Sequence, residues 1–177
     1  MGRIPEKQRL RGAKMKKLCI LLAALIAAAA VLCSCSGGSE SAAQKSAKPL
    51  AEVFKTIRSQ VEISDFNEYN NAKSLDRFYG ITAEQTEDFA GGINSSGTDQ
   101  EEIVFIKAKD SASAEEIKKA FDDRYKSKLA QTKNYNAKQA EMVEKCKPER
   151  FDLYVTLIVS PNADKITEIF KSELNLE

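Results

Sequence analysis

The chain has 177 residues, and its formal net charge of +1 conceals a difference between its two ends. Residues 1–34 hold seven of the 27 basic residues but only one of the 26 acidic residues, so the remainder carries 20 bases against 25 acids, a net charge of −5. Nucleic-acid binding requires clustered Lys and Arg side chains, and this acidic remainder therefore excludes it. The length predicts one ordinary domain.

The N-terminal part has the pattern of a secretory signal. Leu18 to Leu32 is an unbroken apolar run of 15 residues that follows Lys16-Lys17. A membrane-spanning helix needs about 20 such residues, whereas the apolar core of a signal peptide has about 7–15. We therefore predict that residues 1–34 are a signal peptide, and either Met1 or Met15 could be its start.

The run ends at Leu32-Cys33-Ser34-Cys35, which resembles a bacterial lipobox. Cleavage before Cys33 would leave Leu32 beside the cut, where small residues are favoured, so Cys35 is the expected lipidated residue. Two acyl chains on that thiol would anchor the protein stably. The sequence thus predicts an extracytoplasmic protein held at the outer face of the cell membrane by lipid. An ordinary secreted protein with incidental cysteines is the alternative.

We predict that residues 35–48 are the lipidated cysteine and a flexible tether, and that residues 49–177 form the globular domain. The tether is small and polar, with a reach of roughly 20 Å if it behaves as a Gly/Ser-type coil. Beyond the signal, the chain keeps only Cys35 and Cys146. If Cys35 carries lipid, Cys146 has no partner, so we expect no stabilising disulfide.

Helical patterns begin at Pro49, which fits the first turn of a helix. The apolar residues after it recur at helical spacing: Leu50, Val53, Phe54, Ile57 and Val61. Residues 62–80 predict a second, short helix that stops at Gly80. The segment Thr82 to Gln85 fits a capping box, in which the two side chains satisfy exposed N–H groups at a helix start.

Three segments predict strands. Phe151 to Ser160 alternates, with an apolar face of Phe151, Leu153, Val155, Leu157 and Val159. Ile103 to Ala108 is a second strand. Phe89 to Asn94 is a weaker candidate, because Gly91-Gly92 disfavours a strand interior, and it would form a hairpin through the turn at residues 95–98.

Two amphipathic helices follow strands in the same way, and their starts align. Ser111 to Phe121 overlays Ser160 to Phe170 without a gap, each with an acid in the first turn. This alignment predicts a strand–strand–helix pseudo-repeat, and the alternative is that two unrelated amphipathic helices have converged on similar sequences. The repeat requires residues 140–147 to be a strand, but their sequence also fits the end of a helix. The predicted fold is a single α+β domain with an antiparallel sheet of about four strands, helices on one face, and Phe121 and Phe170 in its core.

These features together resemble a known family. The lipobox, the tether and the first helix precede Phe78-Tyr79-Gly80-Ile81, Glu102 to Lys109, a long helix, a strand ending Val159-Ser160 and a closing helix. This order is similar to the domains of unknown function numbered four-three-five-eight, small lipoproteins of Gram-positive Firmicutes, over roughly residues 50–175. The chain departs from the family at Phe89 to Ile93, where β-branched residues are usual. The resemblance implies no catalytic or binding residues.

The residue types argue against catalysis. The chain has no His, and beyond the signal its only cysteine apart from Cys35 is Cys146, which removes the usual triads and thiolate metal sites. Glu115-Glu116 and Asp122-Asp123 are adjacent on helices and diverge, and Asp99 to Glu102 lacks the pattern of a calcium loop. We therefore expect no enzymatic activity, metal or other cofactor.

An interaction role remains. Tyr154, Thr156 and Ile158 fall on the strand face opposite the main apolar stripe, and if exposed they would form a contact patch; the alternative is that the N-terminal helix covers them. The expected function is a non-catalytic interaction module whose partner is an envelope protein or a wall component. A small solute receptor is the second hypothesis, and an envelope enzyme the third.

Overall fold

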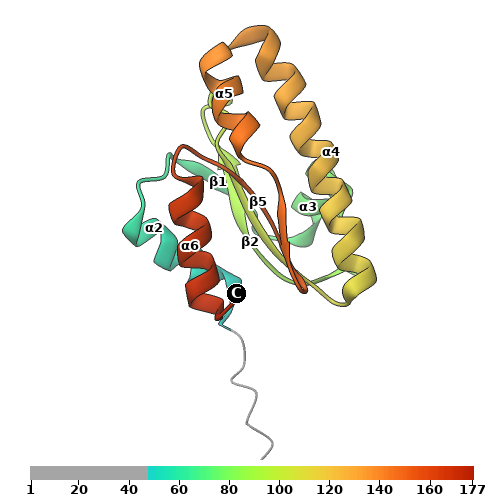
Figure 1. Ribbon diagram of the computed structural model, residues 1–177. Coiled ribbons are helices and arrows are strands. Elements are labelled where there is room, and N and C mark those ends of the chain that lie inside the picture. Colours follow the sequence, from blue (N-terminus) through green and yellow to red (C-terminus); the bar gives the residue numbers. More distant parts are fainter. Residues whose placement is uncertain (1–47) are drawn as a thin grey trace, which may run out of the picture. The chain divides into compact units, whose positions relative to one another are not determined.

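A five-stranded antiparallel sheet organises residues 48–177, the part of the chain that the computed structural model describes (Figure 1). The predicted signal, the lipobox and nearly all of the tether lie outside these residues. In chain order the elements are α2 (Leu50–Gln60), β1 (Phe66–Glu68), α3 (Ala72–Tyr79), β2 (Thr86–Asn94), β3 (Glu102–Ala108), α4 (Ser111–Tyr135), α5 (Ala137–Lys145), β4 (Glu149–Phe151), β5 (Tyr154–Val159) and α6 (Ala163–Leu174).

The strands lie in the order β1-β2-β3-β5-β4, and every neighbouring pair is antiparallel. The predicted α+β class and antiparallel sheet are confirmed. The sheet has five strands instead of about four. The strand predicted over Phe151 to Ser160 is divided by a turn, in which Asp152 has φ +54°, so Phe151 ends β4 and β5 begins at Tyr154. The edge strands β1 and β4 are each only three residues long. Such short segments carry too few residues to show an alternating pattern.

Helices cover both faces of the sheet, which corrects the expectation of helices on one face. Figure 1 shows α2 and α6 on one side, and α3, α4 and α5 on the other. The cause lies in the central strand β3, whose consecutive residues Ile103 to Ile106 are all fully buried and apolar. A strand that is apolar on both faces must be covered on both faces.

The two helices that were predicted from apolar stripes anchor these two cores. Phe170 of α6 stacks on Phe105 of β3, with ring centroids 4.6 Å apart, on the side of α2. Phe121 of α4 meets Tyr79 edge-on at 5.2 Å in the other core. Both phenylalanines are fully buried, as predicted.

The two units of the predicted pseudo-repeat have the same order of elements, but their helices lie on different faces of the sheet. The order strand–strand–helix occurs twice, as β2-β3-α4 and as β4-β5-α6. Residues 140–147 are not the extra strand, because Ala137–Lys145 is helix α5. Moreover, α4 and α6 pack on opposite faces of the sheet, so the two units bury their aligned phenylalanines in different cores.

The weak strand candidate is the real strand β2, and its glycines have a steric reason. Gly91 has φ +132°, and a Cβ there would lie 2.0 Å from the Ile103 carbonyl oxygen. A Cβ on Gly92 would lie 2.5 Å from the Asn67 carbonyl oxygen in β1. Half of the predicted capping box exists. The Thr82 N–H donates to Gln85 Oε1 at 2.8 Å, but the Thr82 hydroxyl donates to the same oxygen instead of accepting an N–H, and the segment is a turn that leads into β2 instead of a helix.

Candidate functional site

The patch predicted from the alternation of β5 is buried. Tyr154, Thr156 and Ile158 are 8%, 2% and 5% exposed, and the two apolar members pack in the core beneath α2 and α6. The covered-face alternative is therefore what the structure shows, and these residues offer no free contact surface. Of the other predicted site residues, the lipobox and Cys35 lie outside the described residues.

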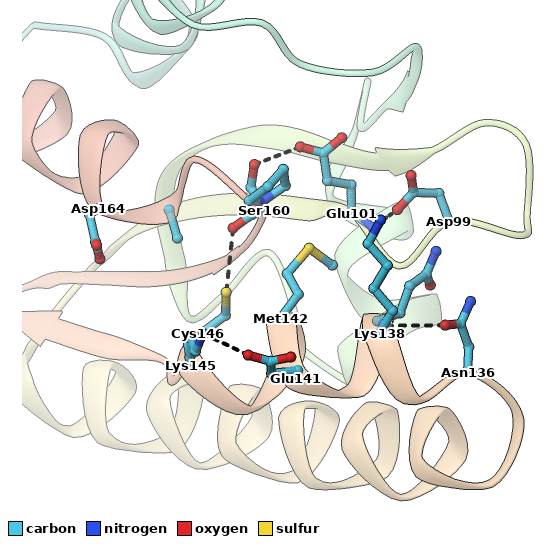
Figure 2. A pocket seen from close by; sticks show the side chains of 13 residues that line it. Asp99, Glu101, Asn136, Lys138, Glu141, Met142, Lys145, Cys146, Ser160 and Asp164 are labelled. Atoms are coloured by element: carbon cyan, nitrogen blue, oxygen red, sulfur yellow. Dashed lines mark hydrogen bonds and ion pairs between the residues drawn. The ribbon is translucent and has the colours of Figure 1, made fainter.

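A different feature, a cleft of about 650 Å³, lies at one end of the sheet. It is bounded by the segment before β3, by α5 and by the start of α6, and we call it the α5–α6 cleft (Figure 2). Its volume is in the range of small-ligand sites. The polar or adaptable side chains on its walls include Asp99, Glu101, Lys138, Met142, Ser160 and Asp164. Figure 2 shows Lys138 extending from α5 toward Asp99.

Glu101 is the most deeply placed acid of this cleft, at 5% exposure. Its carboxylate accepts hydrogen bonds from Ser160 Oγ at 2.6 Å, Ser64 Oγ at 2.5 Å and the Ser64 N–H at 3.3 Å. Each hydroxyl in turn accepts an N–H: Asn94 Nδ2 donates to Ser64 Oγ at 2.8 Å, and the Asn162 N–H to Ser160 Oγ at 3.2 Å. Both hydroxyl protons are therefore directed at the carboxylate, the arrangement that suits an ionised acid.

No cation accompanies that charge within the described part of the chain. None of the ion pairs formed among residues 48–177 includes Glu101. Buried carboxylates are normally paired with a positive charge, since removal from water disfavours an isolated ion. The hydroxyl cradle of Glu101 satisfies hydrogen bonding without supplying that charge.

The next residue, Glu102, has the opposite environment. It is fully buried on the other face of β3, where Arg124 Nη2 and Lys128 Nζ lie 2.8 and 2.9 Å from its Oε2. Tyr79 donates its hydroxyl to Glu102 Oε1 at 2.7 Å, and the Tyr69 hydroxyl lies 2.7 Å from that of Tyr79. Two cations and a phenol thus compensate this carboxylate completely, as a structural ion cluster would.

The pKa values in this cluster follow from burial and charge. Burial acts to raise the pKa of Glu102, but the Arg124 hydrogen bond and the Lys128 charge outweigh it and hold that pKa below its ordinary value. Burial lowers the pKa of Lys128, against the attraction of Glu102. Burial also raises the pKa of Tyr69 to about 12, and the pKa of Tyr79 well above its ordinary value.

Two further groups on the α5–α6 cleft bear on its chemistry. The Cys146 thiol is buried and donates to the Ser160 carbonyl oxygen at 3.6 Å, and burial raises its pKa, so it is not an activated nucleophile. The amide oxygen of Gln139 is buried and has no hydrogen-bond partner among residues 48–177. An unpaired buried acceptor of this kind is uncommon and calls for a donor.

From the sequence we considered the acids from Asp99 to Glu102 only as a possible calcium loop, and the roles of Glu101 and Glu102 were missed. One local signal existed: period-2 alternation from Val104 and Ile106 places Glu102 on a buried strand face. A carboxylate on a buried face is stable only beside positively charged side chains. No local signal reveals Glu101, because Ser64 and Ser160 reach it from distant segments of the chain.

The fold and the cleft define a small α+β domain in which helices cover both faces of an antiparallel sheet and a polar cleft opens at one end. The chain belongs to the family described as "Domain of unknown function (DUF4358)", whose family model matches residues 59–160. The resemblance inferred from the sequence is thereby confirmed. No curated protein and no solved structure matched the chain.

Between residues 48 and 177, no helix combines the length and the apolar character that crossing a bilayer requires. In the same range, no three Cys, Asp or Glu side chains are grouped so that they could hold one metal ion.

Proposed function

We propose that this protein is a lipid-anchored, extracytoplasmic binding protein of the cell envelope, and that the α5–α6 cleft is its binding site. The observation that carries the proposal is the cleft itself, with a buried carboxylate on its wall that forms no ion pair among residues 48–177. The sheet faces are both covered by helices, so neither is free to serve as a flat contact surface. Attachment through Cys35 follows from the lipobox and the apolar run before it.

Binding is favoured over catalysis by the composition of the cleft. Its thiol is buried with a raised pKa. The Ser64 and Ser160 hydroxyls donate to the Glu101 carboxylate, but each also accepts an N–H and Ser160 is only 2% exposed, so we assign both hydroxyls to holding the carboxylate and not to attack on a substrate. The residues of this cleft instead provide acceptors and a charge, which suits recognition.

The cleft also supports a second candidate, a receptor for a small solute. Its volume of about 650 Å³ would accept a ligand of modest size. An interaction module would instead insert one group of a larger envelope component into the same space. The two functions share the site and differ in whether the ligand is free or attached.

Affinity capture from the native membrane tests the proposal. The variant Glu141→Lys/Asp164→Lys reverses two exposed acids on opposite walls of the cleft. The control Asp76→Lys/Glu84→Lys makes the same change of charge at exposed positions outside the cleft. We expect the control to recover the same partner as the unmodified protein and the cleft variant to lose it. Equal recovery by both would rule out the cleft. For the receptor, native mass spectrometry of the purified protein should instead show a bound small molecule.

A further inference from the structure

The acceptors on the α5–α6 cleft define the chemistry of the ligand, an inference that rests on the cleft being the binding site. Glu101 and Gln139 both line it, one a buried carboxylate without a cation and the other with an amide oxygen that lacks a donor within residues 48–177. The Gln139 amide oxygen requires a hydrogen-bond donor, whereas the Glu101 carboxylate, whose hydrogen bonds the serine cradle already satisfies, requires positive charge. A positively charged donor is the ligand chemistry that suits both groups.

The hydrogen bonds of Glu101 leave room for one more donor. A carboxylate has about four lone-pair positions. Oε2 uses two of them for the hydroxyl and the N–H of Ser64, whereas Oε1 accepts only from Ser160 Oγ. The open lone-pair position is therefore on Oε1, the oxygen that accepts the Ser160 hydrogen bond, and Ser160 is itself a wall residue of the cleft.

The charge on the cleft walls agrees with a cationic ligand. Four acids line it, Asp99, Glu101, Glu141 and Asp164, against the two lysines Lys138 and Lys145. Lys145 pairs with Glu141 on the exposed surface at 3.2 Å, which leaves three acids and one lysine without an ion pair among the described residues. The walls thus have a net charge of −2, and they attract cations.

The geometry distinguishes between kinds of cation. No group of three candidate ligands within residues 48–177 converges on one point, so a compact metal ion lacks the ligand set it needs. A guanidinium group prefers to engage both oxygens of a carboxylate at once. Here Oε2 is already occupied, and a single open position suits the point charge and rotatable donors of an ammonium group.

We propose that the α5–α6 cleft binds a primary ammonium group, which donates to Glu101 Oε1 beside Ser160. The ammonium keeps two further donors for other acceptors on the cleft walls. Asp99 and Asp164 at the cleft walls add long-range attraction. The amine could belong to a free solute or to a peptide chain, and the chemistry at Glu101 is the same in both cases.

Saturation-transfer difference NMR with the full chain, isolated in detergent, tests this proposal. The probes are Nα-acetyl-lysine N-methylamide and Nα-acetyl-norleucine N-methylamide, a neutral analogue that lacks the ammonium group, both at millimolar concentration. We expect transfer to the ε-methylene protons of the lysine probe, and little transfer to the norleucine probe. The arginine analogue should bind more weakly than the lysine probe. n-Butylammonium, which lacks the peptide part, distinguishes the sources: comparable transfer indicates a free amine, and much weaker transfer indicates an amine carried by a peptide.

The variant Glu101→Gln should weaken binding of the lysine probe by about tenfold or more, the loss of one charge-assisted hydrogen bond. Asp76→Asn removes an exposed acid outside the cleft and should change nothing. The comparison of the lysine and norleucine probes needs no protein variant, so it tests the proposal even if Glu101→Gln unfolds. Equal transfer to the lysine and norleucine probes, or none to the lysine probe, would overturn the proposal. If that happened while membrane capture still depended on the cleft acids, the ammonium inference would fail and the proposed binding function would stand.

Discussion

Replacing Glu102 with Gln should be among the most destabilising single changes in the domain. The carboxylate is fully buried between Arg124 and Lys128, and the Lys128 side chain is only 4% exposed. Neutralising Glu102 leaves that ammonium in the interior without its counter-ion. Breaking a buried pair by removing one partner costs about 3–5 kcal/mol. We expect a loss near the lower end of this range, because Lys128, whose pKa burial already lowers, can release its proton.

Urea unfolding at neutral pH measures this loss directly. With a typical slope of about 1–3 kcal/mol per molar urea, a loss of about 3 kcal/mol lowers the midpoint by about 1–3 M. The double variant Glu102→Gln/Lys128→Met removes the stranded charge and keeps the apolar stem, so it should be more stable than Glu102→Gln alone. A loss below about 1 kcal/mol, or a double variant in which the two losses simply add, would refute the reasoning.

The same carboxylate predicts an acid limit to stability. The folded-state pKa of Glu102 is lowered, so its contribution is complete above the ordinary carboxyl pKa of 4.5 and is lost as the pH falls through the folded-state value. Urea midpoints measured across acidic pH should therefore fall less steeply for Glu102→Gln than for the unmodified chain. Parallel pH profiles would contradict this assignment.

Three further changes have defined outcomes. Burial raises the pKa of Tyr69 from 10.0 to about 12. Its contribution to the free energy of unfolding is therefore complete below pH 10, and about 2–3 kcal/mol is lost as the pH rises to about 12. Urea unfolding at alkaline pH, compared between the unmodified chain and Tyr69→Phe, should show this loss. Phe121→Ala and Phe170→Ala should each cost about 3–5 kcal/mol in urea unfolding, since both rings are fully buried. Cys35→Ser should prevent lipidation and lipoprotein-type cleavage, whereas Cys33→Ser should prevent neither, as measured by incorporation of labelled fatty acid.

These changes have matched controls. Tyr135 is 89% exposed, so Tyr135→Ala removes an aromatic ring from the surface and should change stability by no more than about 0.5 kcal/mol. If it costs as much as Phe121→Ala, burial does not explain the loss. For the anchor, equal label in the unmodified chain and in Cys35→Ser would exclude that residue as the attachment site. For Tyr69, an alkaline transition unchanged by Tyr69→Phe would contradict the pKa assignment.

The long elements of the fold could be predicted from the sequence because their patterns are local. The helical spacing from Leu50 to Ile57 and the β-branched run from Ile103 to Ile106 each reflect one element that packs against a core. The short edge strands β1 and β4 could not be predicted, because three residues form a strand only where a neighbouring strand supplies hydrogen bonds. Residues 137–145 form a helix that Asn136 caps, through a bond from the Gln139 N–H to Asn136 Oδ1.

The site was harder to predict because it depends on contacts between distant segments. Tyr154 and Thr156 are amphipathic, and alternation alone could not tell whether helices would cover them. Their burial follows from α2 and α6 packing on that face. In the same way, Glu101 acquires its role from Ser64 and Ser160, which lie far from it in sequence. Two adjacent acids at the start of a strand give no sign that Glu102 pairs with two cations while Glu101 pairs with none in the described part of the chain.

Site-specific photo-crosslinking in intact cells tests most directly whether the α5–α6 cleft is the binding site. A photoreactive phenylalanine analogue replaces Lys138, an exposed residue on the cleft wall, or Lys55, an exposed residue of α2 outside the cleft. We expect a discrete cross-linked product from position 138 that diminishes when Glu101 is changed to Gln, and no such product from position 55. The same product from both positions, or a product from position 138 that is indifferent to Glu101→Gln, would contradict binding at this cleft through its buried carboxylate.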